Sequence, residues 1–292
     1  MSATDRPEAT DGGGDAPSRT AAGVASLRAV HQLVDGTPKI LDDPAIVRLL
    51  DAQTMAALHA AREQMQSRAV RALRSHVVLR SRWAEDRLRA AVERGVRRYV
   101  ILGAGYDTFI VRQPAWACDL RIVEVDRAAI QRAKRARLAE VGLAPPANAS
   151  FLEVDFERET LASALARAGV DTDTPTFFSW LGVTMYLTEL AIDAVLRTVA
   201  SYARQSEIVL TFAQPAERDP EHDGPTLAER AAAVGEPWLS YFTPDQIEQK
   251  LRDAGFATVE FLTPERAQAE YFAGREDRLP VPRRTSLVSA VR

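Results

Sequence analysis

The 292-residue chain contains little of what marks several common classes of protein. Its single cysteine, Cys118, excludes an intrachain disulfide and a four-cysteine zinc site. No stretch approaches 18 consecutive apolar residues, and the first residues lack the basic-then-apolar order of a signal peptide. The net charge of −3 gives no general attraction to nucleic acid or to an anionic membrane. We therefore expect a cytoplasmic protein without a nucleic-acid or membrane partner.

Side chains for metal binding or nucleophilic catalysis are also sparse. The four histidines are scattered along the chain, at positions 31, 59, 76 and 222. They form no metal-ligand cluster and no Ser–His–Asp arrangement that the sequence makes apparent. We expect no metal, and the sequence assigns no catalytic residue.

Composition divides the chain into three parts. Residues 1–19 contain no Leu, Ile, Val, Phe, Tyr or Trp, so they predict a disordered tail. Residues 20–94 are dense in helix-forming residues and predict an N-terminal helical cap. Its expected helices cover 20–35, a segment opened by Pro44 after Asp43, 53–75 and 77–93. Residues 95–292 predict an α/β domain.

Short apolar runs separated by helical segments fill this third part. Five of them cover 98–102, 120–125, 150–154, 176–180 and 207–212, and 256–262 and 285–291 add two more. Runs of this length are typical of a parallel sheet that is covered on both faces. The pattern predicts a doubly wound, seven-stranded Rossmann-like sheet.

Residues 213–242 interrupt the alternation after the fifth strand and carry four prolines. An insertion there would overhang the carboxyl ends of the strands, where ligands bind in open α/β sheets. A lid and a plain crossover loop remain equal alternatives.

The strongest local motif is Gly103-Ala-Gly105 directly after the first strand, with Asp126 at the end of the second. Glycines let the backbone approach a ligand closely, and a carboxylate about twenty residues later can accept both ribose hydroxyls. Glu124, two residues deeper in that strand, is the weaker candidate. Asp107 would sit badly beside a pyrophosphate, and Thr108 replaces the third small residue of the dinucleotide motif. The motif therefore indicates an adenosine ligand without phosphates.

Asp155-Phe156 follows the third strand. A carboxylate and an aromatic ring there can bond the adenine amino group and pack on its ring. Alone, the pair is more simply a helix cap beside a core aromatic. Three neighbouring strand ends with ligand-competent residues favour the binding site.

Four segments taken together resemble the leucine carboxyl methyltransferase family, a group of class I methyltransferases that depend on S-adenosyl-L-methionine and include polyketide O-methyltransferases. They are Arg98–Thr108, Val123–Asp126, Val154–Phe156 and Gly182–Leu187. Further similar segments are Thr20–Ala25 with Asp43-Pro44, Leu79–Arg82 with Asp86, Glu236–Trp238, Phe242–Pro244 and Ala254–Phe256. The resemblance runs in order from about residue 20 to 290.

The resemblance implies S-adenosyl-L-methionine as cofactor and gives roles to particular residues. Gly103, with Gly105, lies under the methionine part, Asp126 holds the ribose, and Asp155 with Phe156 frames the adenine. Arg80 and Arg28 match basic residues near the cofactor's carboxylate. Leu181 departs from the family, which commonly has glutamate there, and its apolar side chain removes one polar contact.

These observations favour an O-methyltransferase that acts on a carboxylate or hydroxyl of a small molecule, of the polyketide or another secondary-metabolite kind. A carboxylate acceptor needs no general base, whereas an alcohol or phenol usually does. Tyr186 and Tyr241 remain candidates for hydroxyl partners of the acceptor, and His222 could face a substrate. The alternatives are a nucleoside-binding protein that has lost transfer activity and a nicotinamide-dependent oxidoreductase, against which Asp107 and Thr108 speak. The acceptor and the oligomeric state stay open.

Overall fold

The computed structural model describes residues 18–156, 158–215 and 225–292 of the chain. Most of the predicted disordered tail therefore lies outside the described residues. Its last two residues do not follow the prediction, because Ser18 caps the first helix and Arg19 begins it.

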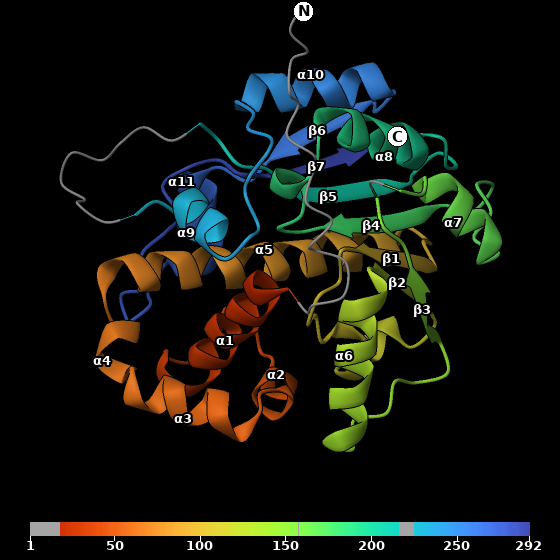
Figure 1. Cartoon of the computed structure of the whole chain (residues 1–292). Helices are drawn as coiled ribbons and strands as arrows, with labels where there is room; N and C mark the ends of the chain where they lie inside the picture. The colour runs from red at the N-terminus through yellow and green to blue at the C-terminus, as the bar shows by residue number, and fades with distance from the viewer. Residues whose placement is uncertain (1–17, 157, 216–224) are drawn as a thin grey trace, which may run out of the picture.

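The described elements form an α/β protein in which five helices precede the first strand (Figure 1). The helices are α1 (Arg19–Val34), α2 (Pro44–Leu49), α3 (Ala52–Ala60), α4 (Arg62–Met65), α5 (Arg68–Glu93), α6 (Ala128–Glu140), α7 (Leu161–Arg167), α8 (Glu189–Ala200), α9 (Leu227–Ala233), α10 (Pro244–Ala254) and α11 (Pro264–Ala267). The strands are β1 (Arg98–Leu102), β2 (Arg121–Asp126), β3 (Ala149–Glu153), β4 (Thr176–Trp180), β5 (Glu207–Thr211), β6 (Thr258–Phe261) and β7 (Leu287–Val291). Short 3-10 turns η1 (Phe109–Val111), η2 (Ala115–Ala117) and η3 (Thr184–Tyr186) and the π-turn η4 (Gln268–Phe272) complete the set.

The seven strands form one sheet in the order β3-β2-β1-β4-β5-β7-β6. The first five run parallel, and β7 pairs antiparallel with both β5 and β6. This confirms the predicted seven-stranded, doubly wound sheet. Strand β1 lies between β2 and β4, so the chain adds β2 and β3 on one side of β1 and then returns to add β4 on the other side. The carboxyl ends of β1, β2 and β4 thus surround the point where such sheets bind ligands.

Alternation along β1 assigns its side chains to two hydrophobic cores. Tyr99 and Ile101 pack with α1, α5 and the N-terminal segment, whereas Val100 and Leu102 pack with α7, α8 and α10 on the other face. Helix α5 lies between the sheet and helices α1–α4 (Figure 1). The predicted division at residue 94 stays a prediction, and the shared core shows that the N-terminal helices and the sheet pack as one unit.

The predicted break near residue 76 is wrong. Helix α5 runs without interruption from Arg68 to Glu93, and the breaks fall instead at Ala61 and at Gln66–Ser67. The segment around His76 holds neither glycine nor proline, so nothing there ends a helix. Buried Leu79 and Trp83 on the same helix hold it against the sheet.

Candidate active site

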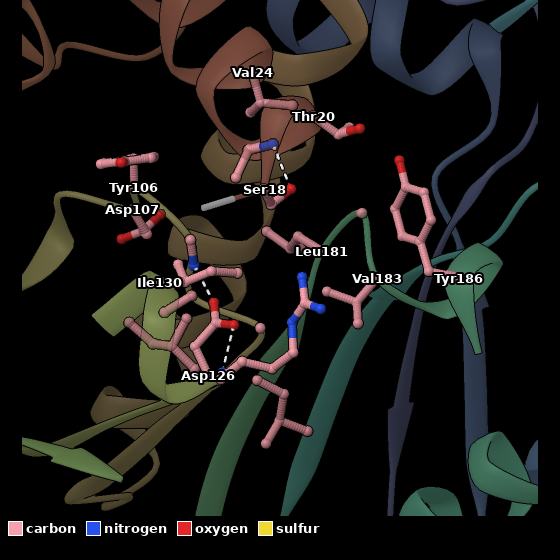
Figure 2. Close-up of a pocket in the computed structure, with 18 of the residues that line it drawn as sticks. Ser18, Thr20, Val24, Tyr106, Asp107, Asp126, Ile130, Leu181, Val183 and Tyr186 are labelled. Carbon is pink, nitrogen blue, oxygen red and sulfur yellow. Dashed lines mark hydrogen bonds between the residues drawn. The ribbon is translucent and has the colours of Figure 1, made fainter. Parts of the chain in front are cut away.

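One cavity, of about 370 Å³, lies over the carboxyl ends of the central strands. All seven residues predicted to bind the cofactor line it, namely Arg28, Arg80, Gly103, Gly105, Asp126, Asp155 and Phe156. Helix α1 covers the cavity from one direction, and Leu181, Val183 and Tyr186 face Asp107 and Asp126 across it (Figure 2). The fold therefore assembles into one site the seven predicted residues, which span the chain from Arg28 to Phe156.

The glycine-rich turn after β1 takes a shape that only glycine adopts easily. Gly103 and Gly105 have φ of +66° and +50°, in the left-handed region. A Cβ on Gly103 would stand 2.3 Å from Cγ2 of Val183, so the turn passes directly against the loop after β4. The backbone is thus exposed to the cavity, where a ligand can approach it closely.

Asp126 joins this turn to the end of β2. The Gly105 N–H donates to Oδ2 of Asp126 at 2.6 Å, and the Arg127 N–H donates to Oδ1 at 2.7 Å (Figure 2). Burial raises the pKa of Asp126, although the two backbone donors oppose this. Each carboxylate oxygen keeps a free lone pair for a further donor such as a ribose hydroxyl.

The weaker candidate, Glu124, points away from the cavity wall. Both of its oxygens accept hydrogen bonds from Nζ of Lys134 at 2.6 Å, and each side chain is only 1% exposed. Glu124 is absent from the described lining residues. The structure therefore leaves Asp126 as the carboxylate of this strand that faces the cavity.

The two arginines have different surroundings. Arg28 is buried, and its guanidinium donates to Asp43 at 2.6 Å, to Thr108 at 3.0 Å and to Asp107 at 3.2 Å. These bonds tie helix α1 to the segment after β1. A contact from Arg28 to the cofactor's carboxylate stays a prediction, and the protein already engages both terminal nitrogens of this arginine.

Arg80 on α5 is the unpaired cation of the pair. Within residues 18–156, 158–215 and 225–292, its guanidinium has no hydrogen bond and no ion pair. Its Nη1 lies 2.6 Å from where a Cβ of Gly182 would stand, so the absence of a side chain at Gly182 makes room for it. Burial, together with the positive charge of Arg28, lowers the pKa of Arg80 to about 10. An anion in the cavity would relieve this cost.

At the other end of the cavity, Asp155 and Phe156 follow β3. The Phe156 ring packs against Trp180 of β4, with 6.4 Å between ring centroids. Asp155 accepts backbone N–H groups of Arg158 and Glu159 through its carbonyl. Ile130 of α6 and Val154 line the same region, so a flat ring would meet apolar surface here. The fit to an adenine base stays a prediction.

The described part of the 213–242 insertion forms another wall. Gly235, Glu236, Pro237 and Leu239 line the cavity. Glu236 accepts the backbone N–H groups of Arg19 and Thr20 at 3.2 and 3.1 Å, and the Leu239 N–H donates to the carbonyl of Met185 at 2.6 Å. This segment therefore connects the start of α1 to the loop after β4. Residues 216–224, with the candidate His222, lie outside the described residues.

Tyr106, Arg127 and Ile130 are among the lining residues that sequence reasoning missed. Position 127 directly follows the ribose candidate Asp126, and Ile130 is on the first turn of the helix after β2, so both positions could have been found from the motif. Tyr186 lines the cavity, whereas Tyr241 is not among the described lining residues. The described residues contain no cluster of side chains able to hold a metal and no helix long and apolar enough to cross a membrane. The cytoplasmic location stays a prediction.

Comparison with solved structures shows that this fold occurs in other proteins. A "putative methyltransferase" of Thermobifida fusca YX superposes with a TM-score of 0.58 over 92% of this chain and 94% of that one, at 17% identity. A DUF574 family protein of Streptomyces avermitilis MA-4680 gives 0.55 over 91% and 97%, also at 17% identity. At this identity the likeness shows the fold alone, which this chain shares with both proteins.

Sequence relatives identify the family. Residues 21–200 match the leucine carboxyl methyltransferase family. The "Putative S-adenosyl-L-methionine-dependent methyltransferase YktD" of Bacillus subtilis (strain 168) is 32% identical over 204 residues, which are 68% of this chain and 67% of that protein. A protein of Mycobacterium marinum (strain ATCC BAA-535 / M), also described as such a methyltransferase, is 30% identical over 226 residues, 75% of this chain and 72% of its own length. The chain belongs to the leucine carboxyl methyltransferase family and is an S-adenosyl-L-methionine-dependent methyltransferase.

Proposed function

We propose that this chain is an O-methyltransferase that forms a methyl ester on the carboxylate of a small molecule. One observation carries the choice of acceptor. No histidine, lysine or cysteine is among the described residues that line the cavity, and protein donors or cations already engage its four carboxylates, Asp107, Asp126, Asp155 and Glu236. A carboxylate is already ionised at neutral pH and loses no proton on methylation, whereas an alcohol or phenol usually needs a general base. The cavity wall suits the acceptor that needs none.

The lining residues fit the cofactor. Arg80 offers an unpaired guanidinium to the carboxylate of the methionine part, Asp126 offers free lone pairs to the ribose hydroxyls, and Phe156 offers a ring face near the end of β3. Gly103 allows close approach of the backbone beneath the methionine part. These assignments use groups that the fold leaves unpaired or only partly engaged.

The protein contributes alignment and exclusion of water. When bound, the cofactor would supply a methyl group on its sulfonium: the acceptor oxygen would attack the methyl carbon in line, the C–S bond would break, and S-adenosylhomocysteine would be the leaving group. Arg80, Asp126 and Phe156 fix the position of the donor, and correct positioning accounts for much of the acceleration in reactions of this kind. The segment from Gly235 to Leu239 and helix α1 cover the site and restrict the access of water. Apolar Leu181, Val183, Leu187 and Leu239 line the wall, which favours an acceptor with an apolar body.

Turnover with methyl-labelled cofactor tests the proposal. The protein is incubated with a panel of carboxylic acids and a matched panel of phenols, and products are treated with mild base. A methyl ester releases labelled methanol, whereas a methyl ether keeps its label. Asp126→Asn should lose most activity through weaker cofactor binding, and Asp119→Asn, the same change at an exposed position outside the described cavity wall, should not.

Each outcome decides between the alternatives. Base-labile product supports the ester, and base-stable product shows a hydroxyl acceptor instead. Cofactor binding without turnover on any panel favours a binding protein that has lost transfer activity. NAD binding in place of S-adenosyl-L-methionine would revive the oxidoreductase alternative and refute the proposal.

A further inference from the structure

The amino-acid end of the cofactor carries a carboxylate and an ammonium, and the arginines account only for the carboxylate. A carboxylate can pair with Arg80, but the neighbouring ammonium group requires an anion or another acceptor. Leu181, which lines the cavity beside Gly182, is apolar and offers none. The ammonium therefore requires one of the carboxylates of the described cavity wall as its binding partner. This reasoning rests on the cofactor site given above.

Four carboxylates are among the described lining residues: Asp107, Asp126, Asp155 and Glu236. Asp126 sits at the end of β2 with both oxygens on backbone N–H groups. Both oxygens of Glu236 accept the first N–H groups of α1, at 3.2 and 3.1 Å. Asp155 follows β3, at the far side of the sheet from β4, and its Oδ2 lies 3.7 Å from Nε of Arg158. None of these three is among the charges that act on Arg80.

Asp107 is different because it lies near enough to Arg80 for its charge to act on that guanidinium, and because its side chain is rigidly held. Its Oδ1 accepts the Phe109 N–H at 2.7 Å, and its Oδ2 accepts Nη1 of Arg28 at 3.2 Å. Two of its roughly four acceptor positions are thus used. The side chain keeps 18% of its surface exposed, and it faces the cavity opposite Leu181 (Figure 2). Burial works against its charge, but Arg28, Arg112 and Lys134 hold the pKa of Asp107 below its usual value.

We propose that the Asp107 carboxylate binds the α-ammonium of the methionine part of the cofactor, while Arg80 binds the α-carboxylate. The two side chains come from different elements, Arg80 from α5 and Asp107 from the turn after β1. Arg28 has a supporting role here, because it fixes Asp107 in place from beneath and is itself fixed by Asp43. The pair forms a zwitterion site that an adenosine without an amino-acid part cannot fill.

Binding of two ligands tests the proposal. S-adenosylhomocysteine and its deamino analogue, in which hydrogen replaces the amino group, are titrated by calorimetry into wild type and Asp107→Asn. Wild type should prefer the amine by about tenfold or more, the effect of one charge-assisted hydrogen bond. Asp107→Asn should bind both ligands with affinities within about twofold of each other, since the anion is gone and the deamino ligand never used it. A merely structural role would weaken both ligands equally and keep their ratio.

Controls separate the outcomes. Asp155→Asn, the same substitution in the same cavity, should keep the wild-type preference for the amine. If Asp107→Asn does not fold, Asp107→Glu keeps the charge and should retain a preference for the amine. An unchanged preference in Asp107→Asn, or no preference in wild type, would overturn the assignment to Asp107 while leaving the cofactor site standing. Binding of neither ligand to folded wild type would overturn the cofactor site and this proposal together.

Discussion

Replacing Gly103 by alanine tests whether the turn after β1 is fixed by close packing as well as by backbone shape. The new Cβ would stand 2.3 Å from Cγ2 of Val183 and 3.3 Å from its Cγ1. Val183 is β-branched and cannot swing a long flexible end away, so backbone on one side must move. The residue also has φ of +66°, which alanine adopts only with strain.

Two terms set the expected loss in free energy of unfolding. The left-handed conformation costs roughly 1–2 kcal/mol for a residue with a Cβ. Overpacking against Val183 adds about 1–3 kcal/mol. Gly105→Ala is the matched control, because its φ is +50° but its nearest neighbour, Cβ of Ala21, is 3.6 Å away. The control should show the backbone term alone, and the gain from a stiffer unfolded chain is common to both variants.

Equilibrium unfolding in urea, followed by tryptophan fluorescence and far-ultraviolet circular dichroism, measures both variants. Gly103→Ala should be less stable than Gly105→Ala by about 1–3 kcal/mol. Adding Val183→Ala to Gly103→Ala should recover most of that difference, which a double-mutant cycle expresses as a coupling energy. Equal losses in the two glycine variants, or no coupling to Val183, would show that the contact does not determine the shape of the turn.

Three further changes test other parts of the site. Gly182→Ala would place a Cβ 2.6 Å from Nη1 of Arg80, at a residue with φ of +77°. Calorimetry should then show about tenfold weaker binding of S-adenosylhomocysteine and a smaller loss for 5′-methylthioadenosine, which lacks the carboxylate. Equal losses for the two ligands would contradict the role of Arg80. Glu236→Gln should cost about 0.5–1 kcal/mol at the start of α1, seen as faster hydrogen exchange of its first two amides, and unchanged exchange would exclude the link. Burial raises the pKa of Glu124 to about 7, although Lys134 opposes the shift, so the folded chain favours the protonated carboxyl more than the unfolded chain does. The contribution of this proton to the free energy of unfolding is complete below about pH 4.5 and is lost as the pH rises through 7. Urea unfolding of Glu124→Gln should lack that decline, and an identical pH profile in both proteins would refute the shift.

The sheet could be predicted because its signals are local. Each strand is a short apolar run, and the predicted and observed bounds agree within two residues for all seven. Helix caps depend on equally local signals. Thr243 forms a capping box with Gln246, and Gly255 ends α10 with φ of +108°. Such features depend on neighbours within a few positions, which the sequence displays directly.

Helix α5 shows where local reading fails. A long stretch rich in Ala, Arg and Leu contains no glycine or proline from 68 to 93, so nothing in the sequence marks one boundary over another. Tertiary packing determines where the helix begins and ends, because the helix continues as long as its buried residues can pack against the sheet and helix α1. Buried ion pairs such as Lys134 with Glu124 also cannot be predicted from local patterns, because the sequence alone does not tell which face of its helix or strand a residue occupies.

The two arginines of the N-terminal helices explain why a binding role is harder to predict than a fold. Arg28 and Arg80 both matched basic positions of the family, and both line the cavity. Long-range partners give them different surroundings, because Asp43 and Asp107 engage Arg28, while Arg80 lies against Gly182 and forms no ion pair among the described residues. A partly buried cation without a partner is costly to fold, and an anionic ligand offsets that cost. The unpaired guanidinium therefore supports Arg80 as the arginine that we propose binds the ligand, and this choice requires the folded chain.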